Sequence, residues 1–168
     1  DKFSIYLFDV KNLKNLYSKE LKLKENLNFI NSNILKDFLD NNIFKVEKIA
    51  GKFVETIILI IENNNILNLH LGIKKKNYDS YINKKQLEIF LTDAKDLFKE
   101  NYQNEKIMHM IINKYLINGK KYPSIQNQIK CNYLGLEIKF TSISNNFIND
   151  LNKVLENYQI NINKCLDK

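Results

Sequence analysis

The sequence predicts a mixed α/β (α+β) fold. Short apolar runs rich in β-formers alternate with amphipathic segments of helical period, and turn or helix-capping residues separate them along the 168 residues. In chain order these segments are strand, strand, helix, strand, then strand, helix, strand, strand, and finally a helix and a strand. With 44% hydrophobic residues the chain can fill a core. Its longest apolar run, 56–61, has strand length, far short of the roughly 18 residues that a membrane span needs.

The N-terminal third is expected to form a strand pair and a helix. Residues 3–9 (FSIYLFD) form the first predicted strand, and 13–23 form the second because leucines alternate with lysines there. A helix over 32–49 would be capped by Ser32 and ended by Gly51. Its buried stripe would consist of Leu35, Phe38, Leu39 and Val46.

A second group of elements follows in the middle of the chain. The run 54–62 has apolar residues on both faces, which is typical of a strand in the middle of a covered sheet. The asparagines 63–65 favour a turn, and 66–74 is the next predicted strand. Asn83 with Gln86 three residues later resembles a capping box. The helix behind it would bury Leu87, Phe90, Leu91, Ala94, Leu97 and Phe98.

Two pairing strands and a final helix and strand complete the prediction. Residues 106–117 should pair with 134–141, in which leucines and other apolar residues alternate with polar ones. Ser144 is expected to cap the last helix, and 159–162 to begin the last strand. Strict alternation in the first of these strands would put on one face Ile107, His109, Ile111, Asn113, Tyr115 and Ile117, and on the other Met108, Met110, Ile112, Lys114 and Leu116.

The net charge of +7 is carried entirely by lysine, since the chain has 26 lysines and no arginine. Its 27 asparagines indicate that the charge follows a biased composition, so a nucleic-acid partner is not expected. The two dense lysine runs look like strand ends or loops and are the candidate partner-binding residues. They are Lys74, Lys75, Lys76, Lys120 and Lys121.

No catalytic or metal site is predicted. Cys131 and Cys165 form no CxxC motif, and His70 and His109 have no acidic or cysteine partner nearby in sequence. A structural role is expected for His109. Without a disulfide framework, a reducing cytoplasm is the expected location.

Residues 54–162 resemble the FtsA family of bacterial cell-division proteins. The family has a stretch close to VLHVIPQEYxID, and IMHMIINKYLIN stands here in its place, with His109 and Tyr115 matching. The segments VETIILII, ILNLHLGI and YLGLEIKFTSIS follow in the family's order. The resemblance implies an actin-like (ribonuclease H-like) subdomain 1A, interrupted by an SHS2-type subdomain 1C (β-α-β-β). In this interpretation residues 1–64 form the first part of subdomain 1A, and residues 65–143 form subdomain 1C. Residues 144–168 form the helix and strand that return to subdomain 1A.

The resemblance implies nucleotide binding only for a full-length parent protein, which would be an actin-like ATPase. The family's first phosphate loop resembles LDIGTSK, whereas this chain has FDVKNLK at 8–14, with Asp9 as a candidate for the Asp position but without the Gly and the Ser/Thr. The second loop would lie beyond Lys168, so the chain is interpreted as a piece of a longer protein. No cofactor is expected for the chain itself, although ATP is possible in the full-length parent.

The implied role is an interaction module in division-septum assembly, at the cytoplasmic side of the cell membrane. Expected partners are other FtsA protomers and late division proteins such as FtsN. FtsZ would be bound only through parts absent here, and no membrane insertion is expected. Alternatives are a PilM-like pilus-assembly protein that binds a partner peptide, a free-standing basic nucleic-acid-binding module, and a small enzyme, the least favoured.

Overall fold

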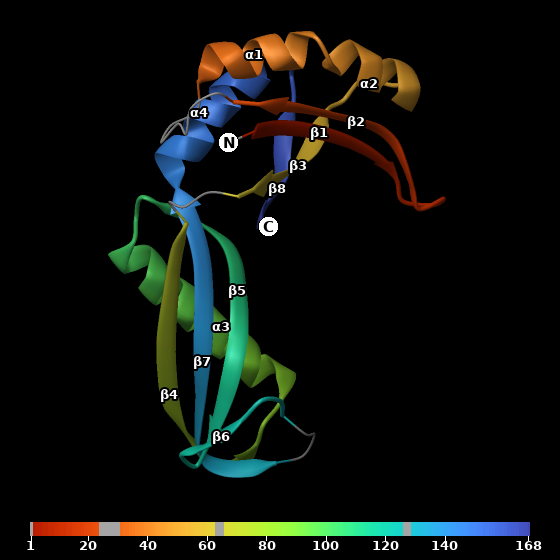
Figure 1. Cartoon of the computed structure of the whole chain (residues 1–168). Helices are drawn as coiled ribbons and strands as arrows, with labels where there is room; N and C mark the ends of the chain where they lie inside the picture. The colour runs from red at the N-terminus through yellow and green to blue at the C-terminus, as the bar shows by residue number, and fades with distance from the viewer. Residues whose placement is uncertain (1, 24–30, 63–65, 126–128) are drawn as a thin grey trace. The chain divides into compact units, whose positions relative to one another are not determined.

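The computed structural model has a mixed α/β fold, as the sequence predicts. It describes residues 2–23, 31–62, 66–125 and 129–168, in which eight strands and four helices form (Figure 1). The expected turn at 63–65 lies outside the described residues. The chain divides into two compact units. Unit 1 comprises residues 1–59 and 146–165, and unit 2 comprises residues 60–145 and 166–168.

Unit 1 begins with an antiparallel hairpin, which confirms the two N-terminal strand predictions. Its strands are β1 (Lys2–Asp9) and β2 (Lys14–Lys22). Side chains alternate between the two faces of β1, so that one face packs against helices. Tyr6 and Phe8 lie on the other face and are 59% and 52% exposed.

The single helix expected over 32–49 is wrong, because the chain forms α1 (Ser32–Asp40) and then α2 (Ile43–Ala50). The side chains of Asn41 and Asn42 each donate a hydrogen bond to the carbonyl four residues back, at 2.7 and 2.5 Å. Side-chain amides that bind backbone carbonyls compete with the helical N–H groups, so the helix ends here. The buried Asn42 also accepts a 2.6 Å hydrogen bond from a tyrosine hydroxyl of β2.

The ends of these helices carry recognisable caps. Asn31, and not the expected Ser32, is the N-cap of α1, and its side chain accepts the N–H of Ile34 at 3.2 Å. Gly51 ends α2 as predicted, in the left-handed conformation with φ 69°. The predicted stripe is confirmed as buried: Leu35, Phe38, Leu39 and Val46.

The strand predicted as the middle of a covered sheet is instead half of a two-stranded sheet. β3 (Thr56–Ile61) pairs with β8 (Asn161–Asp167), which confirms the predicted C-terminal strand. Ile58 and Ile60 are 58% and 61% exposed. An apolar strand is buried on both faces only where other elements cover both faces of its sheet. Among the described strands, β3 pairs with β8 alone.

The core of unit 1 lies between its helices and the inward faces of β1 and β3. α4 (Asn145–Glu156) contributes three of its buried side chains and α1 contributes two, while Ile160 lies between α4 and β8. The hydroxyl of Tyr158, just after α4, donates to the carboxylate of Asp40 at 2.6 Å. The buried members of this core are Leu35, Leu39, Leu151, Val154, Leu155 and Ile160.

Unit 2 is built on a four-stranded antiparallel sheet with the order β4-β7-β5-β6. Its strands are β4 (Leu67–Tyr81), β5 (Glu105–Ile117), β6 (Lys120–Tyr122) and β7 (Lys130–Ser144). The predicted pairing of β5 with β7 is confirmed. The β-α-β-β order implied by the resemblance has three strands, whereas the structure has a fourth, because the chain turns at Asn118 and Gly119 and adds β6 beside β5.

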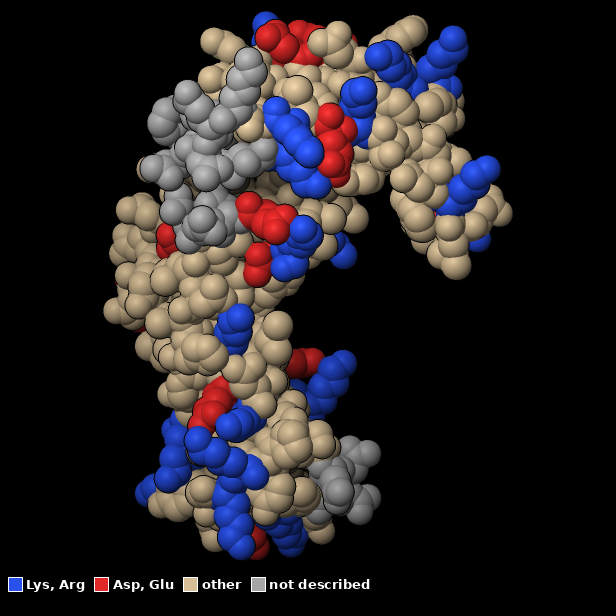
Figure 2. Space-filling model, in the orientation of Figure 1, with Lys and Arg blue, Asp and Glu red and all other residues tan. Residues whose placement is uncertain are grey.

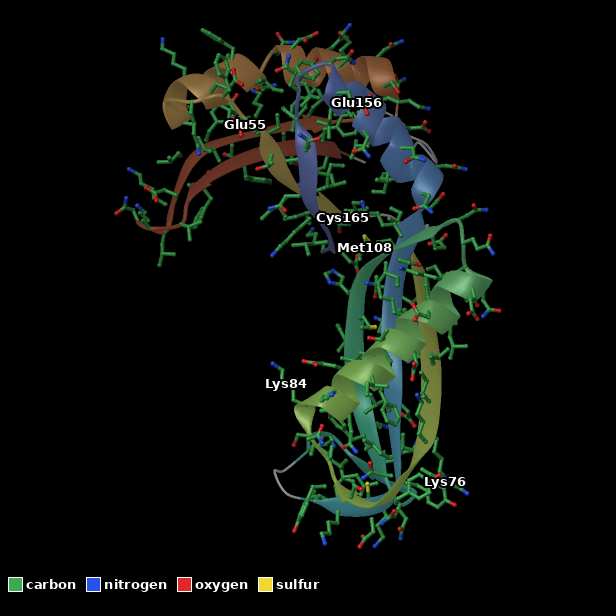
Figure 3. The ribbon with its side chains drawn as sticks, turned by 180° about the vertical axis from the view of Figure 1, so that it is seen from behind. Glu55, Lys76, Lys84, Met108, Glu156 and Cys165 are labelled. Carbon is green, nitrogen blue, oxygen red and sulfur yellow. The ribbon has the colours of Figure 1, made fainter. Side chains whose placement is uncertain are left out.

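A single helix, α3 (Lys84–Asn101), covers one face of this sheet (Figures 1 and 3). The predicted capping box is confirmed: Asn83 Oδ1 accepts the Gln86 N–H at 2.9 Å, and Gln86 Oε1 accepts the Asn83 N–H at 3.1 Å. Phe98 of α3 stacks on Phe140 of β7 with ring centroids 4.8 Å apart, and neither ring is exposed. The other fully buried members of this core are Ala94, Cys131, Leu134, Leu136 and Ile138.

The run Lys74–Lys76 lies in the middle of β4, and not at a strand end or in a loop as expected. Pairing with β7 continues to Lys76, is interrupted, and resumes at Ser80. The interruption is held by Asn77, whose side chain donates to the Ser80 carbonyl at 2.6 Å and accepts from the Gln86 side chain at 2.7 Å. The second of these bonds comes from Gln86 of α3, so alternation in the sequence alone does not show where the strand pairing is interrupted.

The strict alternation expected in β5 is also wrong. The register with β7 shifts between Ile107 and His109, and again between Ile112 and Lys114. Each shift inserts a residue and reverses which side chains face the helix. By register, the residues on the α3 side are Ile107, Met110, Ile112, Tyr115 and Ile117, and those on the opposite side include His109, Ile111, Lys114 and Leu116.

Candidate functional site: a lysine-rich open sheet face

The face of the unit 2 sheet that points away from α3 is contacted at one end by β8, where Asp167 donates its N–H to His109. Beyond that end, strand register places side chains in four rows that run across the strands, with no described element of this unit over them. The rows are Lys76 and Tyr133; Lys74, Gly135, Leu116 and Lys121; Gly72, Glu137 and Lys114; and His70, Lys139 and Ile111. We call these four rows the open face. Neighbouring rows lie about 7 Å apart, because two residues of a strand advance by about that distance.

The open face is strongly positive. Its rows hold five lysines and one carboxylate, so its formal charge is +4 with both histidine and tyrosine neutral. Figure 2 shows lysines gathered over the part of the unit 2 sheet nearest β6, with few acidic groups among them. Because unlike charges are attracted to such a surface over about a Debye length, the face favours anionic partners.

The one carboxylate of the open face is paired within the face. The Lys121 ammonium group lies 2.7 Å from the Glu137 carboxylate. That hydrogen bond lowers the pKa of Glu137 from its usual value, and the charge of the neighbouring Lys114 lowers it further. Among the described residues, no ion pair is formed by the other four lysines of the face, so their charge is available to a ligand.

The structure brings together three of the five predicted lysines. Lys74, Lys76 and Lys121 lie on the open face, where Lys74 Nζ sits 4.7 Å from the centre of the Tyr133 ring. The other two lie on the opposite side of the sheet, and their role in partner binding stays a prediction. Lys75 points to the helix side and forms an ion pair with Asp93 of α3, while Lys120 stands opposite the buried Ile117 on that same side. Adjacent residues of a strand face opposite ways, so a run of lysines cannot all serve one surface.

Two lysines of the open face were missed by the sequence-based prediction. Lys139 alternates with the buried Ile138 and Phe140, so period-two patterning alone places it outside. Lys114 could not be assigned, because the second register shift in β5 determines which side it occupies.

Two glycines determine where the backbone of the open face is accessible. A Cβ atom added at Gly72 would meet nothing within 4 Å, so bare backbone is accessible there. A Cβ at Gly135 would lie 2.9 Å from the Ile73 carbonyl oxygen and 3.3 Å from Leu116 Cβ, so Leu116 already fills that place. Ile111 and Tyr133, 53% and 40% exposed, add apolar surface at opposite ends of the rows.

Asp9, the candidate residue of a phosphate loop, accepts hydrogen bonds from the turn that follows it. One carboxylate oxygen accepts the N–H groups of Lys11 and Asn12 at 2.9 and 3.2 Å, and the other accepts the Asn12 side chain at 2.7 Å. These bonds, the Asn12 side chain first, lower the pKa of Asp9. The arrangement is an Asx turn that closes the β1–β2 hairpin.

The histidines make local contacts. His109 Nε2 accepts the N–H of Asp167 at 2.8 Å, which requires a neutral ring with its proton on Nδ1. This contact agrees with the structural role expected for His109. His70 on the open face lies 3.4 Å from the Asn113 side-chain nitrogen. The described residues contain no group of three or more His, Cys, Asp and Glu side chains that could hold a metal ion.

The helices of the described part of the chain are too short or too polar to cross a membrane. No family model matches the chain, and no curated protein matches it. What the open face binds therefore has to be inferred from its charge, spacing and apolar content.

Proposed function

We propose that the chain is a protein–protein interaction module of the FtsA type, which acts in division-septum assembly by self-association and by recruiting later division proteins. The observation that carries this proposal is the placement of unit 2. A sheet covered by a helix on one face only is inserted between two stretches of chain that form unit 1. A sheet with one uncovered face and a long edge strand, β4, offers a partner both a surface and backbone groups.

We also propose to which subdomain each of the two units corresponds. Unit 1 would be part of an actin-like subdomain 1A, and unit 2 would be an SHS2-type subdomain 1C. The resemblance of IMHMIINKYLIN and the neighbouring segments to FtsA supports this assignment, as does the division of the chain at residues 59–60 and 145–146. In this proposal the parent protein works at the cytoplasmic side of the membrane at the division site, with FtsA protomers and FtsN-type proteins as partners.

We propose a binding role and not a catalytic one. The open face presents lysines, one paired glutamate and bare backbone, which is a composition suited to contact with a partner. A nucleophile, a base and an orienting group within hydrogen-bond reach of one another would be required for the commonest hydrolytic chemistry. ATP binding is proposed only for a full-length parent.

The proposal is tested by measuring self-association and partner choice. Sedimentation velocity over a range of micromolar concentrations should show a concentration-dependent shift from monomer to larger species. A two-hybrid screen against the cytoplasmic segments of division proteins from the same genome should give pairs. A monomer at all concentrations that pairs with none of them would contradict the proposal, and pairing with a pilus-assembly peptide instead would favour the PilM-like alternative.

A further inference from the structure

We propose that the open face binds an extended acidic segment of a partner protein, in which carboxylates at alternate positions pair with lysines in successive rows. This inference rests on the proposed function in one respect: it assumes that the chain acts by binding a protein. It goes further by naming the surface and the chemistry of the occupant.

The spacing of the lysines fits such a segment. Each of the four rows contains at least one lysine: Lys76 in the first, Lys74 and Lys121 in the second, Lys114 in the third and Lys139 in the fourth. The rows are about 7 Å apart, and side chains at alternate positions of an extended peptide have the same repeat of about 7 Å. A strand-like peptide that runs along β7 can therefore place one carboxylate over each row.

The face is also shaped for close approach. Gly72 leaves backbone uncovered in the third row, where a glycine in a strand allows another chain to approach closely. The exposed side chains of Ile111 and Tyr133 offer apolar contact in the fourth and first rows. The occupant is expected to combine acidic residues with small side chains over the centre of the face.

A nucleic acid fits these observations less well. The chain contains no arginine, which is the residue best suited to grip phosphate with two hydrogen bonds. Single strands are held by aromatic rings on which bases stack. The four rows hold two aromatic side chains, Tyr133 and His70, at opposite ends of the face, and Lys74 Nζ already lies 4.7 Å from the Tyr133 ring centre.

The test uses the full chain and two labelled peptides of equal length and charge. One carries glutamate at every second position, and the other carries the same glutamates in one block. Fluorescence anisotropy at low salt should show tighter binding of the alternating peptide. The paired substitution K74E/K139E should weaken it about tenfold or more, because two attractive contacts become repulsive. The matched pair K85E/K95E on α3 changes the net charge equally and should change affinity less than about twofold.

A second substitution separates shape from charge. Gly72→Thr adds a side chain whose Cβ meets nothing within 4 Å, and threonine is favoured in strands, so the melting temperature should not fall, whereas affinity for the alternating peptide should drop several-fold. A peptide with lysine in place of glutamate should bind K74E/K139E better than the unsubstituted chain. That gain would show that the paired variant is folded.

Three results would overturn the inference. They are equal losses in the open-face and α3 pairs, equal binding of both peptides with no effect of Gly72→Thr, and binding of a single-stranded RNA oligonucleotide in preference to both peptides. If the chain self-associates or pairs with division proteins but binds no acidic peptide, this inference fails while the proposed function stands. If the peptide binds and no division protein does, the acidic-segment site stands and the proposed function fails.

Discussion

Lys121 Nζ lies 2.7 Å from the Glu137 carboxylate, so the single negative charge of the open face is held by one of its own lysines. Glu137 also lies in the same row as Lys114 and Gly72. It therefore stands where a carboxylate of the proposed ligand would approach. Glu137 limits how strongly the face attracts an acidic segment.

Replacing Glu137 with glutamine should raise the affinity of the chain for the alternating acidic peptide by about two- to five-fold, since one repulsive charge near the ligand is removed. The amide can still accept a hydrogen bond from Lys121, and an exposed ion pair contributes only about 0–1 kcal/mol, so stability should change little. Anisotropy titrations measure the affinity. Glu100→Gln on α3 has the same net charge and should leave the affinity unchanged; equal gains in both variants would point to a general charge effect.

The two glycines of the open face should respond oppositely to alanine. Gly135→Ala should lower the free energy of unfolding by about 1–3 kcal/mol, because the new Cβ meets the Ile73 carbonyl oxygen at 2.9 Å and Leu116 at 3.3 Å. Gly72→Ala should be neutral or stabilise by up to about 1 kcal/mol, since its Cβ meets nothing and glycine is unfavourable in a strand. Urea denaturation of both variants checks this, and equal effects would contradict the described register of β4 and β7.

His109→Phe should lower the free energy of unfolding by about 1–2 kcal/mol. The ring is kept, but Nε2 no longer accepts the Asp167 N–H, which loses its 2.8 Å partner. His70→Phe serves as the control, because His70 is exposed and its nearest polar contact is at 3.4 Å. Urea denaturation should separate the two variants. Equal stability of His109→Phe and the unsubstituted chain would mean that this hydrogen bond contributes nothing.

The β1–β2 hairpin should lose stability in acid through Glu20. Hydrogen bonds from Lys2 Nζ at 2.8 Å and from the Tyr6 hydroxyl at 2.5 Å lower its pKa to about 2. A lowered pKa in the folded state stabilises above the unfolded value of about 4.3, and this stabilisation is lost as the pH falls towards 2. Glu20→Gln should therefore flatten the fall in melting temperature between pH 5 and pH 2.

Tyr6→Phe removes one of the two hydrogen bonds to Glu20 and should flatten that acid-induced fall by a smaller amount than Glu20→Gln does. Circular dichroism melts across this pH range measure both effects. Parallel curves for the glutamine variant and the unsubstituted chain would show that Glu20 is not perturbed in the folded state.

Local signals in the sequence predict the elements whose ends depend on a few neighbouring residues. The Asn83–Gln86 capping box, the left-handed Gly51 and the alternation of β7 all act within one turn or one strand. Elements that depend on distant partners were not predictable in this way. The break at Asn42 and the interruption of β4 at Asn77 each involve a side-chain hydrogen bond from another element, from Tyr17 of β2 and from Gln86 of α3.

The candidate site shows the same division. The two lysine runs lie on strands that form the open face, but the strand register determines which face of the sheet each lysine occupies. Lys75 and Lys120 face the helix side, and Lys114 lies on the opposite face from Met110 and Ile112 because the register of β5 shifts between Ile112 and Lys114. Such shifts have no local sequence signature in this chain, so the open face could be recognised only once the strands were paired.

The most direct measurement of the central claim is a chemical-shift map of ¹⁵N-labelled chain titrated with the alternating acidic peptide. If the peptide binds the open face, the largest shifts fall on its amides, at Gly72, Lys74, Lys114, Glu137 and Lys139, with little change in α3 or in unit 1. Largest shifts on α3 or on unit 1, or no shifts at a peptide concentration that saturates the anisotropy signal, would contradict this claim.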